Sequence, residues 1–198
     1  MKRSTFFLLI LLLAAPAFAQ TGQQFGFLLG GTKRLYSSHD KDAAALNNET
    51  LPIDRFRLTH GAKEVFYAVE VEPATWFKIQ AGQWNTDVGI VQKDPLKLPR
   101  SGTIQHADGI VDYRFTDLYG TTGLFVGLGI YRWSASGAAP DAIHDVPTET
   151  NYGYTFGVDG EFPMTRRYAF MVEGAYHWIN MSSPVRYVTL MGGVRVAF

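Results

Sequence analysis

The sequence contains no cysteine in its 198 residues, so no disulfide bond can stabilise the fold. It also lacks any excess of charge, because 18 Lys and Arg residues balance 18 Asp and Glu residues. A balanced chain does not offer the basic surface that nucleic acids require, so we expect no nucleic-acid partner. Beyond the N-terminal segment, no stretch approaches the ~20 consecutive apolar residues of a membrane-spanning helix. Judged by hydropathy alone, the sequence is therefore typical of a soluble secreted protein.

The N-terminal segment has the three parts of a secretory signal peptide. In MKRSTFFLLILLLAAPAFAQ, two basic residues precede an apolar run over residues 6–15, and Ala-Phe-Ala follows at residues 17–19. The apolar run is too short for an ordinary transmembrane helix. We therefore predict that residues 1–19 are a cleaved signal peptide and that residues 20–198 form one domain.

Apolar and polar residues alternate with a period of two along eight segments of the remaining chain. Each segment is longer than the roughly five or six residues of an average globular strand. Their lengths are close to the about nine to eleven residues with which a tilted strand crosses a bilayer. The eight predicted strands are 24–33, 63–72, 75–84, 104–115, 122–133, 151–162, 168–178 and 186–198.

Short and long connections alternate between these predicted strands. The short ones lie at Pro73-Ala74, at TDLYGT (116–121) and at PMTRR (163–167). The long ones cover residues 34–62, 85–103 and 134–150, with a shorter fourth at 179–185. Outer-membrane barrels keep their periplasmic turns short and their extracellular loops long. We therefore predict an all-β fold, an eight-stranded antiparallel up-and-down transmembrane barrel with both termini in the periplasm.

The two faces of each predicted strand differ in kind. One face carries large apolar side chains, and the other carries small and charged residues. A soluble lipocalin-like barrel turns its apolar face inward around a ligand, whereas a membrane barrel turns it toward lipid. The small residues favour the membrane barrel, because they fit a crowded lumen but weaken a solvent-exposed strand. They are Gly123, Gly127, Gly129, Gly153, Gly157, Ala169 and Ala175.

The charges on the same face are of mixed sign, so they can pair across a narrow lumen, as buried charges must. They are Glu70, Lys78, Asp112, Arg114, Asp159, Glu161, Glu173 and Arg195. An eight-stranded barrel has an interior only wide enough for side chains. We therefore interpret these residues as a structural charge network that plugs the lumen, not as the lining of a pore.

Aromatic residues gather near both ends of the predicted strands, as in the two girdles of membrane barrels. Tyr113, Phe115, Phe162, Tyr168 and Phe198 lie toward the short turns. Tyr152, Tyr154, Tyr176 and Trp178 lie toward the long loops. Trp84 and Trp133 fall on the lumen face instead and depart from this pattern.

The sequence ends in GGVRVAF, an alternating strand that reaches its last residue, Phe198. A membrane barrel has no free edge, so this strand is expected to pair with the first one. The ending resembles the terminal strand of bacterial outer-membrane proteins, where a final Phe is read by the barrel-assembly machinery.

With its strand spacing, the chain resembles the small eight-stranded outer-membrane barrels of the OmpX, Ail, opacity-protein and OmpA-barrel type. This resemblance implies residence in the outer membrane of a Gram-negative bacterium. Its partners would be membrane lipid, lipopolysaccharide and the assembly machinery.

The same resemblance places any surface-interaction or adhesin-like role in the long loops, since loops on a rigid scaffold often carry function. Extracellular ligands at these loops are therefore candidate partners. The longest candidate loop is LYSSHDKDAAALNNETLPIDRFRLTHGA, followed by NTDVGIVQKDPLKLPRSGT and SASGAAPDAIHDVPTET. Solvated loops without a ligand are an equally simple interpretation. The alternative from another class is a secreted or periplasmic lipocalin-like binder of a small ligand.

A lipid A-modifying enzyme is a weaker alternative, because it needs a Ser nucleophile beside a His on the outer rim. His177 lies near the loop end of its strand, and Ser182 and Ser183 follow, but no His-x-Ser arrangement is present. We therefore predict no catalytic residue and interpret His177 as a hydrogen-bond partner in the lumen.

No metal site and no cofactor are predicted. A metal site would require two loops to meet, and neither has recognised ligand spacing. The residues in question are His39, Asp40, His144 and Asp145.

Overall fold

The computed structural model describes residues 22–35, 58, 60–88, 100–136, 148–181 and 184–198. The predicted signal peptide and most of the three longest predicted loops lie outside these residues. The same is true of His39, Asp40, His144, Asp145, Ser182 and Ser183. No helix in the described part of the chain is long and apolar enough to cross a membrane.

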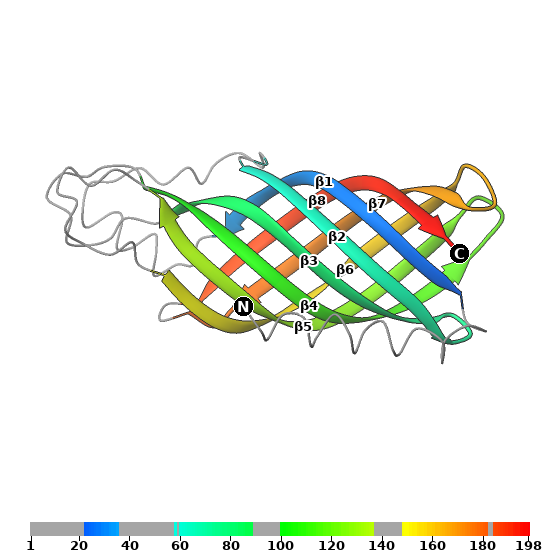
Figure 1. The fold of residues 1–198 in the computed structure, drawn as a ribbon, viewed down its shortest axis with the longest axis horizontal. Coiled ribbons are helices and arrows are strands. Elements are labelled where there is room, and N and C mark those ends of the chain that lie inside the picture. Colours follow the sequence, from blue (N-terminus) through cyan, green and yellow to red (C-terminus); the bar gives the residue numbers. More distant parts are fainter. Residues whose placement is uncertain (1–21, 36–57, 59, 89–99, 137–147, 182–183) are drawn as a thin grey trace, which may run out of the picture.

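Eight strands are present in the described residues (Figure 1). They are β1 (Gln23–Leu35), β2 (His60–Glu72), β3 (Thr75–Val88), β4 (Arg100–Thr116), β5 (Thr121–Ser136), β6 (Thr148–Pro163), β7 (Tyr168–Ile179) and β8 (Val185–Ala197). Several reach further toward the loops than predicted: β3 continues to Val88 and β4 begins at Arg100. Their backbones still pair there, beyond the point where apolar alternation ends.

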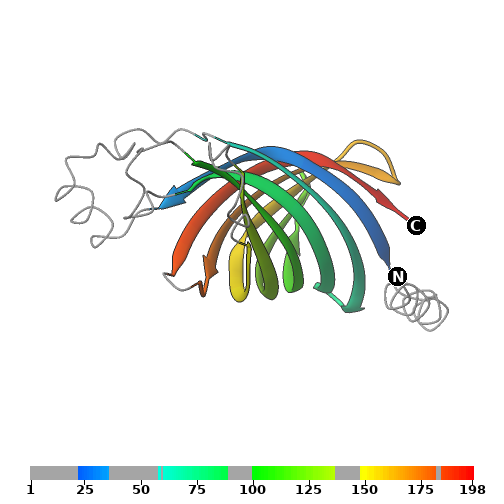
Figure 2. The same ribbon diagram turned by 60° about the vertical axis from the view of Figure 1, so that its left-hand side comes forward.

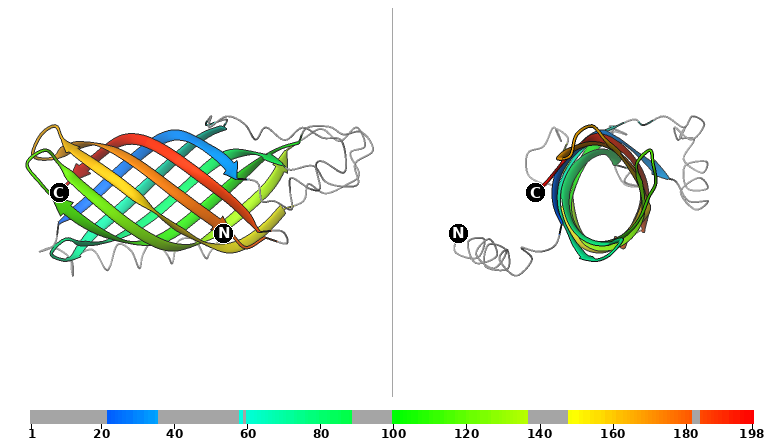
Figure 3. Two further views of the ribbon diagram at one scale, coloured as in Figure 1. Left: turned by 180° about the vertical axis from the view of Figure 1, so that it is seen from behind. Right: turned by 90° about the vertical axis from the view of Figure 1, so that its right-hand side faces the viewer.

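The strands form a closed antiparallel barrel in which each strand pairs with its neighbours in sequence and β1 pairs with β8. The end-on view shows this closed ring (Figure 3). The predicted eight-stranded up-and-down fold is therefore confirmed.

Three tight turns and the C-terminal end of β8 lie at the same end of the barrel (Figure 1). In the β2–β3 turn, Ala74 follows Pro73 with a φ of 66°, a conformation that residues with a Cβ seldom adopt. In the other two turns, the side chains of Asp117 and Thr165 each accept two backbone hydrogen bonds. These local bonds allow the chain to reverse without a long loop.

The outer wall of the barrel is apolar. On β5, Val126, Leu128 and Ile130 point outward and are 60, 72 and 62% exposed. The aromatic residues of both predicted girdles also lie on the outer face, whereas Trp84 is buried in the lumen. The interior, by contrast, contains fully buried charged residues such as Lys78. This distribution is the reverse of a lipocalin-like barrel with an apolar cavity, so that alternative is wrong.

The seam between β1 and β8 closes the ring, and the two strands run side by side in both views (Figure 1 and Figure 2). Their pairing extends from Gln24 opposite Ala197 to Leu35 opposite Arg186. Beyond the last paired residue, the backbone N–H of Phe198 donates a hydrogen bond of 3.0 Å to the carbonyl of Gln23. The seam therefore includes Phe198.

Removing Phe198 should lower the amount of folded barrel in the membrane several-fold, because the seam loses its last bond and the strand loses its terminal aromatic side chain. The exposed turn variant Leu118→Ala is the control and should fold at the wild-type level. The measurement is the gel mobility of unboiled membrane fractions, in which folded barrels migrate differently from boiled ones. Equal folded levels in the two variants would contradict a special role for Phe198.

Candidate functional site

The lumen is filled by side chains in successive layers, of which the first, the mouth layer, lies nearest the short turns. Arg114 donates from Nε to Asp112 Oδ2 at 2.6 Å and from Nη1 to Glu161 Oε1 at 2.8 Å. The second oxygen of Glu161 accepts from Arg195 Nε at 2.7 Å. The Arg114 guanidinium also lies 4.4 Å from the ring centroid of Trp76. Two cations and two carboxylates from β4, β6 and β8 thus pair within one layer.

A middle layer surrounds Lys78 on β3. Its Nζ donates to Glu173 Oε2 at 2.7 Å and lies 3.8 Å from Asp159 Oδ2, and the Lys78 and Glu173 side chains are both fully buried. Gln80 donates to the other oxygen of Glu173 at 3.1 Å. The centroid of the Phe125 ring lies 4.5 Å from the ammonium group. The charge of Lys78 is therefore compensated from β6 and β7, on the far side of the lumen.

The third layer, the histidine layer, is nearer the loops. The imidazole of His106 lies between two buried carboxylates, with Nδ1 hydrogen bonded to Asp108 and Nε2 3.4 Å from Glu64. Gln80 hydrogen bonds to Glu64 and so connects this layer with the middle one. Carboxylate, amide and imidazole groups therefore join the middle and histidine layers into one polar network.

An aromatic cap closes the lumen on the loop side of the histidine layer. Trp84 is fully buried, and its ring centroid lies 4.5 Å from that of His106 and 4.8 Å from that of His177. His177 Nδ1 lies 3.1 Å from the Tyr131 hydroxyl, and Nε2 lies 3.2 Å from the Thr189 hydroxyl. Both ring nitrogens of His177 therefore have partners inside the lumen, and His177, Tyr131 and Thr189 are all buried.

Glycines on the lumen face of β5 explain how charged groups fit inside so narrow a barrel. A Cβ at Gly123 would overlap the carboxylates of Asp112 and Asp159, and a Cβ at Gly129 would overlap Asp108. The side chains of β4 and β6 therefore lie directly over the backbone of β5. Glycine leaves them room that any larger residue would occupy.

The structure brings most of the predicted charge network together. Glu70 does not join it: it is half-buried near the short-turn end, and within the described residues it forms no ion pair. The predicted residues that lie in the lumen and form ion pairs are Lys78, Asp112, Arg114, Asp159, Glu161, Glu173 and Arg195.

The sequence prediction missed the histidine layer. His106 and Asp108 share the strand parity of Asp112 and Arg114, so the alternation already placed them in the lumen. Glu64 was missed because it lies at the edge of its predicted strand, beside Lys63, which faces outward. The residues of the described chain offer no group of three or more side chains suited to hold a metal ion.

Comparisons with known proteins find this fold in structures of outer-membrane proteins. Neisserial surface protein A has a TM-score of 0.60 and 13% identity, over 91% of this chain and 98% of that one. A major outer-membrane protein from Thermus thermophilus has a TM-score of 0.61 and 10% identity, over 89% of this chain and 99% of that one.

A third similar structure is the attachment invasion locus protein Ail of Yersinia pestis, solved in complex with the heparin analogue sucrose octasulfate. Its TM-score is 0.50 and its identity 12%, over 90% of this chain and 97% of that one. No protein family and no curated protein matches the sequence. The likeness at these identities shows the fold, which is that of the small eight-stranded outer-membrane barrels.

Replacing Lys78 with methionine leaves Glu173 and Asp159 buried without their cation, and the free energy of unfolding should fall by about 3–5 kcal/mol. The double variant Lys78→Met/Glu173→Gln removes both partners of the 2.7 Å pair. Its loss should therefore be smaller than the sum of the two single losses. Urea titration of the barrel refolded in lipid vesicles, followed by tryptophan fluorescence, gives each value. Additive losses would show that the two residues are not coupled.

Gly123→Ala places a methyl group where two carboxylates lie, and should lower the free energy of unfolding by about 1–3 kcal/mol. The matched control is Gly109→Ala on the outer face, where a Cβ would have no neighbour closer than Phe77 at 3.7 Å. This control should change stability by no more than about 0.5 kcal/mol. The same urea titration compares them, and equal losses would rule out close packing of carboxylates over β5.

Proposed function

We propose that this protein is an integral outer-membrane barrel of a Gram-negative bacterium with a structural or surface-interaction role and no catalytic activity. One observation supports this most strongly: a belt of outward apolar side chains surrounds a closed ring whose charged groups are paired inside. Residues 1–19 would be removed as a signal peptide, and residues 20–198 would form the barrel.

The height of the apolar belt supports the proposal that the outer wall faces membrane lipid. On β5, the outward residues between Thr122 and Arg132 are all apolar. Ten residue steps of about 3.3 Å, tilted by about 40°, span roughly 25 Å along the barrel axis. That is about the height of the apolar band of outer-membrane barrels. The aromatic girdles lie at its two edges, as amphipathic rings do at headgroup level.

The filled lumen supports a structural rather than a channel function. The mouth, middle and histidine layers and the aromatic cap occupy the interior with side chains from β2 to β8, and β1 adds the buried Gln24, Leu28 and Thr32. Paired charges favour one register of the strands, because another register would separate the partners and leave a buried charge uncompensated. No wide aqueous path is consistent with this packing.

A surface-interaction role would be carried by the three long loops at the end opposite the termini. The fold supports this indirectly, since one similar structure is that of an attachment invasion protein bound to a heparin analogue. Assembly would proceed through recognition of the terminal strand, ending at Phe198, by the barrel-assembly machinery. Membrane lipid and lipopolysaccharide would surround the wall.

The membrane proposal predicts that the protein is extracted only by detergent and shifts its gel mobility on boiling. A variant in which residues 36–57 are replaced by a short turn should behave in the same way, because the ring does not depend on that loop. Only its binding to host cells or to heparin-like polysaccharide should fall.

Two outcomes would count against the proposal. Recovery of the wild type in the soluble periplasmic fraction without detergent would reject membrane placement. Unchanged binding after each of the three long loops is shortened in turn would reject the surface-interaction role and leave the barrel itself intact.

A further inference from the structure

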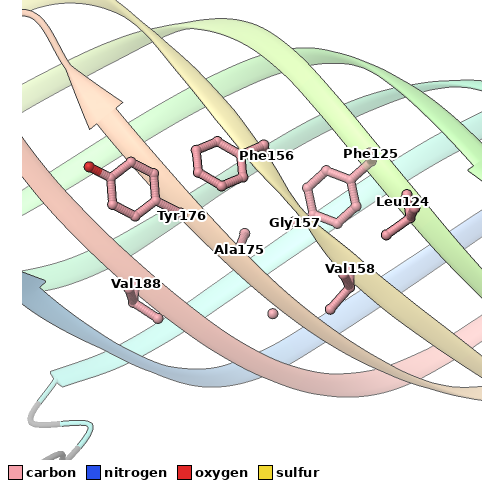
Figure 4. Close-up of a pocket in the computed structure, with 9 residues that line it drawn as sticks. Leu124, Phe125, Phe156, Gly157, Val158, Ala175, Tyr176 and Val188 are labelled. Atoms are coloured by element: carbon pink, nitrogen blue, oxygen red, sulfur yellow. The ribbon is translucent and has the colours of Figure 1, made fainter.

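The outer wall has a groove of about 500 Å³ across β5, β6, β7 and β8 (Figure 4). On one side the rings of Phe156 and Tyr176 form a ridge, with centroids 4.9 Å apart, and on the other lie Leu124 and Val158. Gly174 forms part of its floor. A Cβ there would meet nothing nearer than a Leu190 methyl at 4.0 Å, so a missing side chain creates the hollow.

The strand register shows what lies above the groove. Outward residues that pair directly across β6, β7 and β8 form three rows, which lead from the groove toward the loops. They are Val158-Gly174-Leu190, Phe156-Tyr176-Val188 and Tyr154-Trp178-Arg186. From the groove toward the loops, the outer wall therefore presents an aromatic ridge and then a cation.

The uppermost row has the composition of a membrane–water interface. Tyr154 and Trp178 stack with ring centroids 4.7 Å apart, and Arg186 beside them is exposed on the outer wall. Arg186 forms no ion pair with any carboxylate in the described residues. Lys33 on β1 lies diagonally beside it, because Lys33 pairs with Val188. An anion at this level would meet the positive charge of Arg186 on β8.

On the loop side of the outer wall, the charged side chains that the structure describes are all of one sign. Among side chains that the structure describes there, the outward-facing charged residues are Lys33, Lys63, Arg132 and Arg186. All four are cations. Such a surface complements phosphate groups in the adjoining leaflet. Of the four, Arg186 is nearest to the groove along its own strand: it lies two residues from the groove residue Val188, whereas Arg132 lies seven residues from the groove residue Phe125.

We infer that this wall holds one phosphorylated, acylated lipid of the loop-side leaflet, the lipid A part of lipopolysaccharide, with an acyl chain in the groove and a phosphate on Arg186. The inference rests on the membrane placement proposed above. The distance between the cation and the groove suits a single lipid molecule. Leu190, in the same row as Gly174, lies four residues from Arg186, or about 13 Å along the strand. That length, along a tilted strand, stays within one leaflet of the roughly 30 Å hydrocarbon core.

The test uses the full barrel, refolded from denaturant in lipid-free detergent and titrated with bis-phosphorylated lipid A under native mass spectrometry. Arg186→Gln removes the cation, and Gly174→Leu places a side chain in the groove from a position where a Cβ meets nothing nearer than 4.0 Å. Their matched controls are Arg132→Gln, a cation of the same rim that lies seven residues from Phe125, the nearest groove residue of its strand, and Gly109→Leu, an outer-face glycine outside the groove.

The wild type should retain one lipid A molecule. Arg186→Gln should weaken that binding by about fivefold, the size of effect expected for one surface cation. Gly174→Leu should also weaken it, because its side chain occupies the place of the acyl chain. Both controls should bind as the wild type does. Lipid A without its phosphates should bind the wild type and Arg186→Gln equally.

Three results would overturn the site: equal binding by all four variants, equal retention of phosphatidylethanolamine, or a second copy of the chain occupying the groove as a dimer in place of lipid. None of these results would change the heat-modifiable gel mobility of the barrel or its extraction by detergent. Failure of the lipid site is therefore distinguishable from failure of the membrane placement.

Discussion

Closure of the hydrogen-bonded ring is the constraint on which the rest of the structure depends. A sheet surrounded by hydrocarbon cannot leave a row of N–H and C=O groups unpaired, because no water is present to bond them. The β1–β8 seam meets that requirement from Gln24 to Leu35 along one strand, and the bond from Phe198 to Gln23 extends it. Once eight strands close, the radius is set, and the alternation of every strand divides its residues between wall and lumen.

The narrow radius then dictates what the interior contains. Large side chains cannot face one another from all eight strands at one level, so bulky residues alternate with glycine. Phe66 lies over Gly26, Phe125 over Gly157, and the carboxylates of Asp112 and Asp159 over Gly123. The glycines do not only reduce volume: they allow side chains of neighbouring strands to reach partners across the lumen. The ion pairs of the lumen therefore depend on the positions of the glycines.

The sequence predicted the fold because alternation, strand length and turn spacing are local properties. It could also place Lys78 and Glu173 on the lumen face, since parity within a strand is local too. It could not say that these two residues meet, because they come from β3 and β7 and their levels depend on the register and tilt of every strand between them. Glu70 shows the limit: it has lumen-face parity and pairs with Trp76, which pairs in turn with Asp112, yet it forms no ion pair with a described residue.

The charged lumen also bears on how such a chain reaches its membrane. A segment of ~20 apolar residues would be held in the first membrane it meets as a helix. Alternation prevents such a segment, and the charged residues of the lumen lower the hydropathy of each strand further. Asp112 and Arg114, for example, interrupt what would otherwise be a run of apolar residues from Ile110 to Phe115. The pairs that stabilise the folded barrel are thus the same residues that keep the unfolded chain from inserting too early. An apolar lumen of equal volume would pack as well but would lose that property, which is a physical reason for a barrel this small to be filled with ion pairs.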